Sequence, residues 1–359
     1  MATHRLRGTP GIRPRGARNA TPRTLAIGLA RGACYHSNRR LASHRRSGAR
    51  AFQNRPSRST IRRPFASWWN RVRSSSLRRV YERLPSPFRD AYRLAARWPS
   101  RARWQLSHEG RRHAQEVLLP LRDRFRGHRA IVMGNGPGLV ATDWSLVRGE
   151  ATLGTNRIYL LRDTMGFDPD MYCCVDGLVL EQFYAEISAL PSLKLLDWRI
   201  GGRFLRADRR TVFLPEIPDF AFHGDLLGGW NHGYTVTFAA LQAAFYLGFD
   251  RVILIGVDHR FRVKGPPTRE VTSHEPDRDH FVPDYFGRGV RWHLPHLAGS
   301  ERAYATARAA YLRAGREILD ATEGGALRIF PRMSLQEALT LPGPEKAGDL
   351  LRAAIQAEG

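Results

Sequence analysis

Short apolar runs follow Gly127 in this sequence and alternate with longer segments in which apolar residues recur every three or four positions. Several of the short runs are apolar at every position, as strands covered on both faces must be. We predict strands at 129–134, 151–156, 171–176, 193–198, 211–216, 251–258 and 327–331, and helices at 178–190, 236–247 and 301–321.

Strands and helices that alternate along the chain are typical of a mostly parallel sheet with helices on both faces. We therefore expect an α/β fold, with one Rossmann-like domain of the GT-A-variant kind over 121–340. An amphipathic stretch at 344–357 predicts a C-terminal helix that packs outside this domain, within a terminal region at 341–359.

The segment at 65–120 contains patches with helical spacing, basic faces and narrow apolar stripes. Helices of this kind either dock on the neighbouring domain or lie against an anionic membrane surface. We favour docking, so that 65–120 forms a set of peripheral helices before the main domain.

Charge is distributed very unevenly along the chain. Residues 1–81 contain 20 arginines, no lysine and no acidic residue, so they carry most of the formal net charge of +24. The arginine, serine, proline and glycine of 1–64 cannot bury enough surface to offset the entropy of ordering, and we expect a disordered tail there. Three explanations of the tail remain open. It is a phosphate-binding or membrane-surface arm, a transit-type peptide, or the result of a translation start assigned too far upstream.

The remainder of the chain is close to neutral, so an inference of nucleic-acid binding would depend on the tail alone. Since no apolar run approaches the 18 residues of a spanning helix, we expect a cytoplasmic protein, with peripheral contact to the inner membrane face as an alternative. Cys34, Cys173 and Cys174 offer neither a disulfide framework nor a metal spacing, and the adjacent pair is expected to be buried in a strand.

The first predicted strand ends in the run GNGPG at 134–138. Its small residues would let the backbone approach a phosphate or ribose, and the segment after it can present free N–H groups. A tight turn that needs glycine and proline explains the same residues. Because the run lacks the lysine of a Walker loop and the full spacing of a dinucleotide fingerprint, it is weak evidence alone. Its candidate binding residues are Gly134, Asn135, Gly136 and Gly138.

Polar side chains also follow three other predicted strands. Asn156 ends the second strand, Asp176 the third, and Asp258, His259 and Arg260 the sixth. Asparagine can bind a base edge or ribose hydroxyl, and aspartate can accept from a sugar or hold a cation, although each alone could be a helix cap. Because ligands bind beyond the carboxyl ends of the strands in open parallel sheets, these residues together predict a ligand site.

Two further segments contribute candidates. A glycine-rich segment at 228–235 places Tyr234 and Thr235 at the start of an expected helix, whose N-terminus suits an anion or is simply capped. The polar, aromatic loop at 277–287 supplies His280 and Asp284 as candidate acid or base groups. The nearby His293 and His296 match no zinc spacing.

Taken in order, these segments resemble the domain family that contains the archaeal 6-hydroxymethylpterin diphosphokinases (MptE-like) and the bacterial flagellin-glycosylation accessory factors. They are more distantly similar to the bacterial CMP-sialic acid sialyltransferases. The resemblance spans 129–332 and is carried by GNGPG at 134–138, GTNRIYLL at 154–161, TFAALQAAFYLGFDRVILIGVD at 237–258, DHFVPDYF at 279–286 and ERAYATARAAYLRAGREILDAT at 301–322.

This resemblance implies that Asn135, Gly136 and Asn156 contact the nucleotide, since the sialyltransferase-like members hold CMP with the equivalent residues. Those enzymes bind the donor phosphate with tyrosines after the strand that matches 251–258. Arg260 and Lys264 occupy that stretch here, and a cation can replace a phenol in this role.

The resemblance leaves the catalytic base open. In the sialyltransferases the base is a histidine four residues after another histidine, but here the matching position is Asp284, with His280 ahead of it. Gly138 also stands where serine is usual, so one side-chain hydrogen bond is missing.

Three functions follow from these observations. The first is a glycosyltransferase that needs no metal or cofactor: Asn135, Asn156 and Arg260 bind a CMP-linked sugar donor and His280 or Asp284 deprotonates the acceptor. The second is pyrophosphoryl transfer from ATP to a hydroxymethylpterin, with Asp176 and Asp258 holding Mg²⁺. The third is a nucleotide-binding module without catalysis. The sequence leaves the sugar, the acceptor and the oligomeric state open.

Overall fold

The computed structural model describes residue 88 and residues 98–357, all of which belong to the unit Phe65–Gly359. The predicted tail at 1–64, Cys34 and most of the predicted peripheral helices lie outside the described residues. None of the helices in the described part of the chain is both long enough and apolar enough to cross a membrane.

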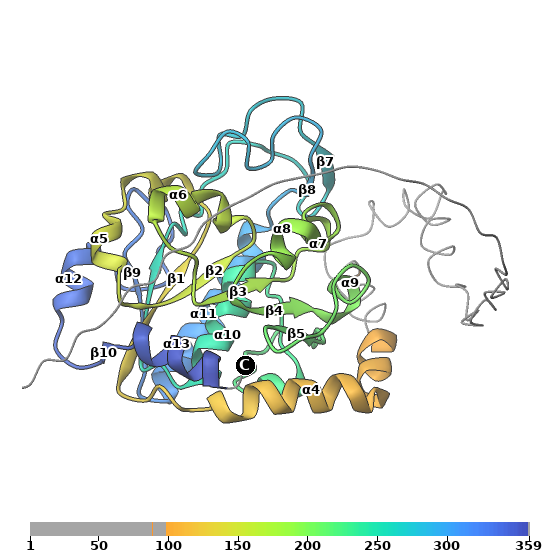
Figure 1. Cartoon of the computed structure of the whole chain (residues 1–359). Helices are drawn as coiled ribbons and strands as arrows, with labels where there is room; N and C mark the ends of the chain where they lie inside the picture. The colour runs from red at the N-terminus through yellow and green to blue at the C-terminus, as the bar shows by residue number, and fades with distance from the viewer. Residues whose placement is uncertain (1–87, 89–97, 358–359) are drawn as a thin grey trace, which may run out of the picture. The chain divides into compact units, whose positions relative to one another are not determined.

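A single large parallel sheet forms the centre of the described unit (Figure 1). Its strand order is β5-β4-β3-β2-β1-β6-β9, and a short strand, β10, pairs with the start of β1. All of these pairings are parallel, which confirms the predicted α/β class. The strands are β1 His128–Met133, β2 Ala151–Thr155, β3 Met171–Cys174, β4 Leu193–Asp197, β5 Thr211–Leu214, β6 Arg251–Ile255, β9 Glu317–Asp320 and β10 Glu345–Lys346.

Helices cover both faces of the sheet. Ala130 and Val132 of β1 belong to one core cluster, whereas Ile131 and Met133, which point the opposite way, belong to a second cluster. The first core is completed by α4 His108–Leu118, α10 Val236–Leu247, α11 Leu297–Arg313 and α13 Gly348–Ala357, and the second by α5 Trp144–Val147, α6 Arg162–Met165, α7 Gly177–Gln182, α8 Tyr184–Ser188 and α12 Leu335–Thr340.

The connections contain shorter elements. These are the helix α9 Trp198–Gly201, the 3₁₀ helices η1 Leu119–Leu121, η2 Pro137–Ala141, η3 Ile158–Leu161 and η4 Leu226–Gly228, and the antiparallel pair β7 Glu270–Thr272 and β8 Arg291–His293. The β7–β8 pair stands apart from the main sheet (Figure 1).

The prediction of a strand at 327–331 is wrong. Those residues have no strand structure, and the seventh strand of the sheet is β9, inside the segment predicted as a helix at 301–321. The helix α11 ends at Arg313 because Gly315 follows with a φ of +69°, a conformation that suits glycine after a helix. Leu327 and Phe330 are buried in the first core as parts of a loop, so their apolar character reflects burial and not a strand.

Two other predicted helices differ in extent. The segment at 178–190 forms two short helices, α7 and α8, which meet at Phe183, where the backbone leaves the helical region. The C-terminal segment starts with β10 and continues as α13, whose Leu351 and Ile355 are buried in the first core. The expectation that this helix packs outside the domain is therefore corrected, because its apolar stripe is part of the main core.

The helix α4 is docked on the domain. Ser107 caps α4 by accepting a hydrogen bond from the Gly110 N–H, and the face with Val117 and Leu118 is buried. Cys173 and Cys174 are buried in β3, and burial raises the pKa of the Cys173 thiol to about 12. Both cysteines are therefore unreactive core residues at neutral pH.

Candidate active site

Four of the candidate residues lie at one edge of the sheet. Asn135 follows β1, Asn156 follows β2, Asp176 follows β3 and Asp258 follows β6. The strands β3, β2, β1 and β6 are neighbours in the sheet and run parallel, so their carboxyl ends share this edge.

The GNGPG turn packs directly against the segment after β6. The N–H groups of Gly134 and Gly136 donate to the carbonyls of Ile255 and Gly256, both at 2.8 Å. A Cβ on Gly136 would lie 1.9 Å from Oδ2 of Asp258. Protein neighbours therefore require the small residues here, and their presence is not in itself evidence for a phosphate.

Asn135 is buried and oriented by a chain of hydrogen bonds. Its Nδ2 donates to Oγ1 of Thr155 at 2.8 Å, and that hydroxyl donates to the Met133 carbonyl at 2.8 Å. Among the described residues its Oδ1 has no hydrogen-bond partner, although it is buried. A buried acceptor without a partner is costly, so a water molecule or a ligand donor would be needed to satisfy this atom.

Asp258 presents a second acceptor of the same kind. Its Oδ1 accepts from the Gly138 N–H at 2.9 Å, while Oδ2 is buried and, in the described part of the chain, makes no hydrogen bond. Burial raises the pKa of Asp258, and the Gly138 N–H and the charge of Arg260 only partly oppose this effect. Because its carboxylate takes up the Gly138 N–H, that N–H is not open to a phosphate.

Asn156 has an unusual backbone conformation. Its φ is +45°, which asparagine tolerates better than most residues, and its Oδ1 accepts a weak hydrogen bond from the Cys174 thiol at 3.5 Å. Two other residues near this edge also have a positive φ. Tyr234, shortly before α10, has a φ of +62°, and His259, shortly after β6, has a φ of +52°. Strained backbone of this kind often accompanies functional sites.

The loop at 277–286 contains an oriented histidine. Nδ1 of His280 lies 2.8 Å from Oδ2 of Asp277, and the ring stacks on Tyr285 with 4.0 Å between centroids. Burial raises the pKa of Asp277, but the hydrogen bond and charge of His280, with backbone N–H groups, lower it on balance. An ionised carboxylate only accepts, so it holds the proton on Nδ1 of His280, and in the neutral ring Nε2 then has the lone pair.

The same loop is fastened to the ends of β1 and β2. The Phe281 N–H donates to the Asn135 carbonyl at 3.3 Å, and the Arg157 N–H donates to the Tyr285 hydroxyl at 3.3 Å. The buried guanidinium of Arg157 also donates to the carbonyls of Asp284 and Tyr285. His280 is thereby held next to the Asn135 turn and the residue that follows Asn156.

Sequence reasoning noted Arg157 after Asn156 at the end of the second predicted strand but assigned no role to it or to Asp277. Arg157 stands within GTNRIYLL, but nothing local showed that its guanidinium binds a loop far along the chain. Asp277 had one usable signal, its position three residues before His280, which is the spacing that lets a carboxylate reach back to the ring.

The remaining candidates are placed less centrally. The side chain of Asp284 is exposed, as are those of Arg260 and Lys264, and Arg260 donates to the Gly324 carbonyl at 3.3 Å. Thr235 immediately precedes α10, but its side chain does not form a capping hydrogen bond. Its hydroxyl oxygen instead lies 3.2 Å from the hydroxyl oxygen of Tyr304.

Asp176 is occupied as the cap of α7. Its Oδ1 accepts from the Leu178 and Val179 N–H groups and lies 3.8 Å from Nδ1 of His293. Burial raises the pKa of Asp176, but His293 and the two N–H groups lower it on balance. Three strand spacings of about 4.8 Å, or roughly 14 Å, separate the ends of β3 and β6. With ligand distances of about 2.1 Å, one Mg²⁺ ion cannot contact both Asp176 and Asp258.

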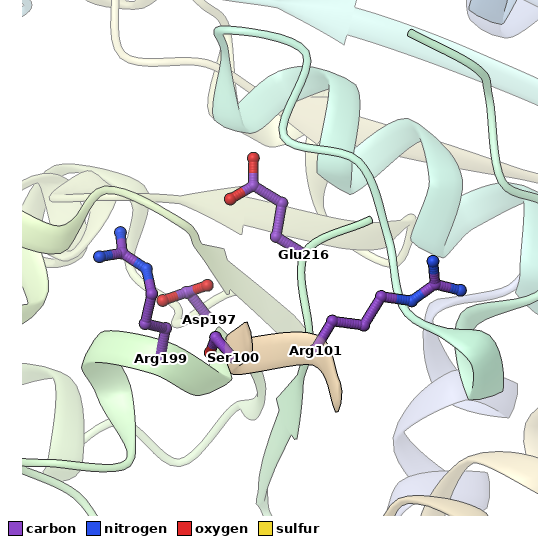
Figure 2. Close-up of a pocket in the computed structure, with 5 residues that line it drawn as sticks. All are labelled: Ser100, Arg101, Asp197, Arg199 and Glu216. Atoms are coloured by element: carbon purple, nitrogen blue, oxygen red, sulfur yellow. The ribbon is translucent and has the colours of Figure 1, made fainter. Parts of the chain in front are cut away.

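A further cluster, absent from the sequence predictions, lies at the ends of β4 and β5. One ligand atom from each of Asp197, Glu216 and His232 falls within 4.8 Å of the others. Asp197 and Glu216 line a cleft of about 190 Å³ with Ser100, Arg101 and Arg199 (Figure 2). No local sequence motif marks any of these three residues, so their proximity is seen only in the folded structure.

Comparison with known proteins identifies no family for this chain. No protein-family profile and no curated protein matches this chain. The solved structure of the MAf glycosyltransferase from Magnetospirillum magneticum AMB-1 aligns with 16% sequence identity and a TM-score of 0.41. The alignment covers 69% of this chain and 42% of that chain, so it spans less than half of the MAf protein.

Proposed function

We propose that this protein is a glycosyltransferase that uses a nucleotide-sugar donor, CMP-linked as the sequence resemblance suggests, in surface-glycan or protein glycosylation. One observation supports the proposal most strongly. The loop with His280, which is oriented by Asp277, is fastened to the Asn135 turn by the hydrogen bond from the Phe281 N–H to the Asn135 carbonyl, and Oδ1 of Asn135 is buried without a hydrogen-bond partner among the described residues. A base candidate and a buried acceptor are therefore joined through adjacent segments, which supports a shared site.

The chemistry of the edge suits the nucleoside part of a donor. Oδ1 of Asn135 and Oδ2 of Asp258 are both buried acceptors, which match the hydroxyl groups of a ribose or the amino group of cytosine. Neither suits a phosphate, because acceptors repel an anion. The phosphate would instead face the exposed Arg260 and the start of α10 near Thr235, where N–H groups and the helix dipole favour negative charge.

In the proposed reaction, Nε2 of His280 takes the proton of an acceptor hydroxyl. The acceptor oxygen forms a bond to the anomeric carbon of the sugar while the bond from that carbon to the phosphate oxygen breaks. The nucleotide leaves with the electron pair, and Arg260 meets its charge. Asp277 stabilises the imidazolium that forms on His280. The exposed Asp284 has no comparable orientation, so we assign the base to His280.

Pyrophosphoryl transfer is less compatible with this arrangement. It requires Mg²⁺ across the phosphates, and Asp176 and Asp258 are too far apart to share one ion. Asp176 is also engaged as the cap of α7. We therefore favour glycosyl transfer over pyrophosphoryl transfer. If the protein binds the nucleotide but does not turn it over, we would conclude that it is a non-catalytic nucleotide-binding module.

A thermal-shift panel tests the proposal, with CMP, CDP, UDP and ATP each added with and without Mg²⁺. We expect CMP to raise Tm by about 5–10 °C at a hundredfold excess over Kd, independently of Mg²⁺. Asn156→Ala should abolish this shift. Asn156→Gly is the matched control for backbone strain, because glycine accepts the positive φ while lacking the side chain.

The panel distinguishes the alternatives. Stabilisation by ATP only in the presence of Mg²⁺ would support pyrophosphoryl transfer, and no shift with any nucleotide would reject a nucleotide site here. If Asn156→Gly binds CMP as the wild type does, the asparagine side chain does not contact the nucleotide.

A further inference from the structure

We infer that Asp197, Glu216 and His232 form a binding site for a divalent transition-metal ion with Zn²⁺-like ligand preference. Asp197 is the last residue of β4, Glu216 lies just beyond β5, and His232 lies in the glycine-rich segment before α10. The fold thus brings two carboxylates and one imidazole together from three separate segments. Imidazole with carboxylate is a donor set that Zn²⁺ accepts readily.

The distances assign a role to each residue. Nε2 of His232 lies 3.6 Å from Oδ2 of Asp197, which is long for a hydrogen bond. It is close to the roughly 3.4 Å that separates two ligands bound at about 2.1 Å to one tetrahedral ion. On the other side of the ring, Nδ1 lies 3.3 Å from Oε2 of Glu216. A carboxylate that holds the second ring nitrogen is the usual partner of a metal-binding histidine.

Asp197 supplies an independent observation. Its side chain is only 1% exposed, and its Oδ2 is buried with no hydrogen-bond partner among the described residues. Its Oδ1 accepts from the Ile200 N–H at 2.9 Å, which caps α9 and fixes the carboxylate with Oδ2 toward His232. A buried carboxylate oxygen without a hydrogen bond is costly, and a cation would satisfy it.

A shallow cleft lies beside Asp197. Its volume of about 190 Å³ includes open solvent, and Arg199 and Arg101 lie on either side of it in Figure 2. Neither arginine forms an ion pair with Asp197 in the part of the chain that the structure describes. Water molecules in the cleft would complete the shell around an ion held by Asp197 and His232.

The ion would have a structural role. Glu216 already pairs with Trp230 across a short bridge, and the Ile217 N–H donates to the Trp230 carbonyl at 2.7 Å. A metal ion would fasten this pair of segments to the end of β4 and so fix the segment that leads to Thr235 and α10. The inference is independent of the proposed glycosyl transfer, and its test does not use enzyme activity.

The test measures metal binding by the full chain without a polyhistidine tag. After treatment with EDTA and dialysis, Zn²⁺ is titrated by calorimetry, and bound zinc is counted by mass spectrometry after gel filtration. We expect about one tightly bound Zn²⁺ per wild-type chain and an increase in Tm on binding. Asp197→Asn and His232→Gln should each lose this ion, while Glu216→Gln should bind about 10–100-fold more weakly.

The control is His223→Gln. His223 also faces a carboxylate, with Nε2 at 2.9 Å from both oxygens of Asp219, but it lies outside the cluster, so this variant should bind zinc as the wild type does. Asp197→Asn keeps the Oδ1 acceptor that caps α9, and circular dichroism of each metal-free variant checks the fold. Equal zinc binding by wild type, Asp197→Asn and His232→Gln would overturn the inference. Absence of tight Zn²⁺ binding by the wild type would also overturn it and indicate that His232 pairs with the carboxylates without a metal ion.

Discussion

Replacing Asp277 with asparagine tests the proposed base most directly. Oδ1 of Asp277 accepts from the N–H groups of Asp279 and His280 at 2.8 and 3.2 Å. Oδ2 accepts from Nδ1 of His280 at 2.8 Å and from the Phe286 N–H at 3.0 Å. In Asp277→Asn, one of these oxygen positions becomes an NH₂ group that cannot accept.

If the NH₂ group faces the ring, His280 must offer its Nδ1 lone pair and carry its proton on Nε2. The base is then in the wrong tautomer, and a general base contributes a factor of about 10²–10⁴ to the rate. The Phe286 N–H is left without its acceptor at a cost of about 1–3 kcal/mol, which lowers Tm by about 3–10 °C. We expect the affinity for CMP to stay within about twofold, since the Asp277 carboxylate makes its hydrogen bonds within its own loop.

The assay measures release of the nucleotide from a CMP-linked sugar by chromatography, at saturating donor and below the melting temperature of the variant. Asp284→Asn is the control, because that carboxylate is exposed, and its rate should match the wild type. The reasoning fails if Asp277→Asn releases nucleotide at the wild-type rate. A large loss in Asp284→Asn alone would assign the base to Asp284.

The same variant should change the acid limb of the stability profile. The pKa of Asp277 is lowered in the folded protein, so its carboxylate stabilises the fold above the ordinary aspartate pKa of about 4. That contribution is lost as the pH falls through the lowered pKa. Asp277→Asn should therefore approach the wild-type Tm as the pH falls below about 4, and a constant difference across this range would contradict the assignment of charge.

Two further predictions concern the turn after β1. Gly136→Ala places a Cβ 1.9 Å from Oδ2 of Asp258 and should cost about 1–3 kcal/mol of stability by thermal unfolding, whereas Gly228→Ala, with no atom within 4 Å, should be neutral. Equal Tm values for both variants would refute the packing argument. Burial raises the pKa of Asp258, so its ionisation destabilises the fold as the pH rises from about 4 through the raised pKa. Asp258→Asn should then have a Tm at pH 7 equal to or above that of the wild type but bind CMP more weakly. A lower Tm together with unchanged CMP affinity would contradict both the expected stability and the expected role in binding.

The sequence determined the sheet because local pattern and burial agree there. Runs such as Met171–Cys174 are apolar at every position, and a strand buried on both faces satisfies such a run in a segment this short. Parallel strands end at one edge, so the same pattern also predicted where Asn135 and Asn156 would lie. The pattern failed at 327–331, because the apolar Leu327 and Phe330 fill the core from a loop, and apolar character records burial and not backbone form.

Only the tertiary structure decided which distant residues touch. Asp258 lies within contact distance of the turn at Gly136. The Phe281 N–H joins the loop of His280 to Asn135, and Asp197 at the end of β4 lies close to His232 in the segment before α10. Each of these contacts depends on strand order and on the path of long loops. Local propensity and spacing carry no information on either, since they act over a few residues, whereas the order of the strands is fixed by how all the apolar faces are covered together.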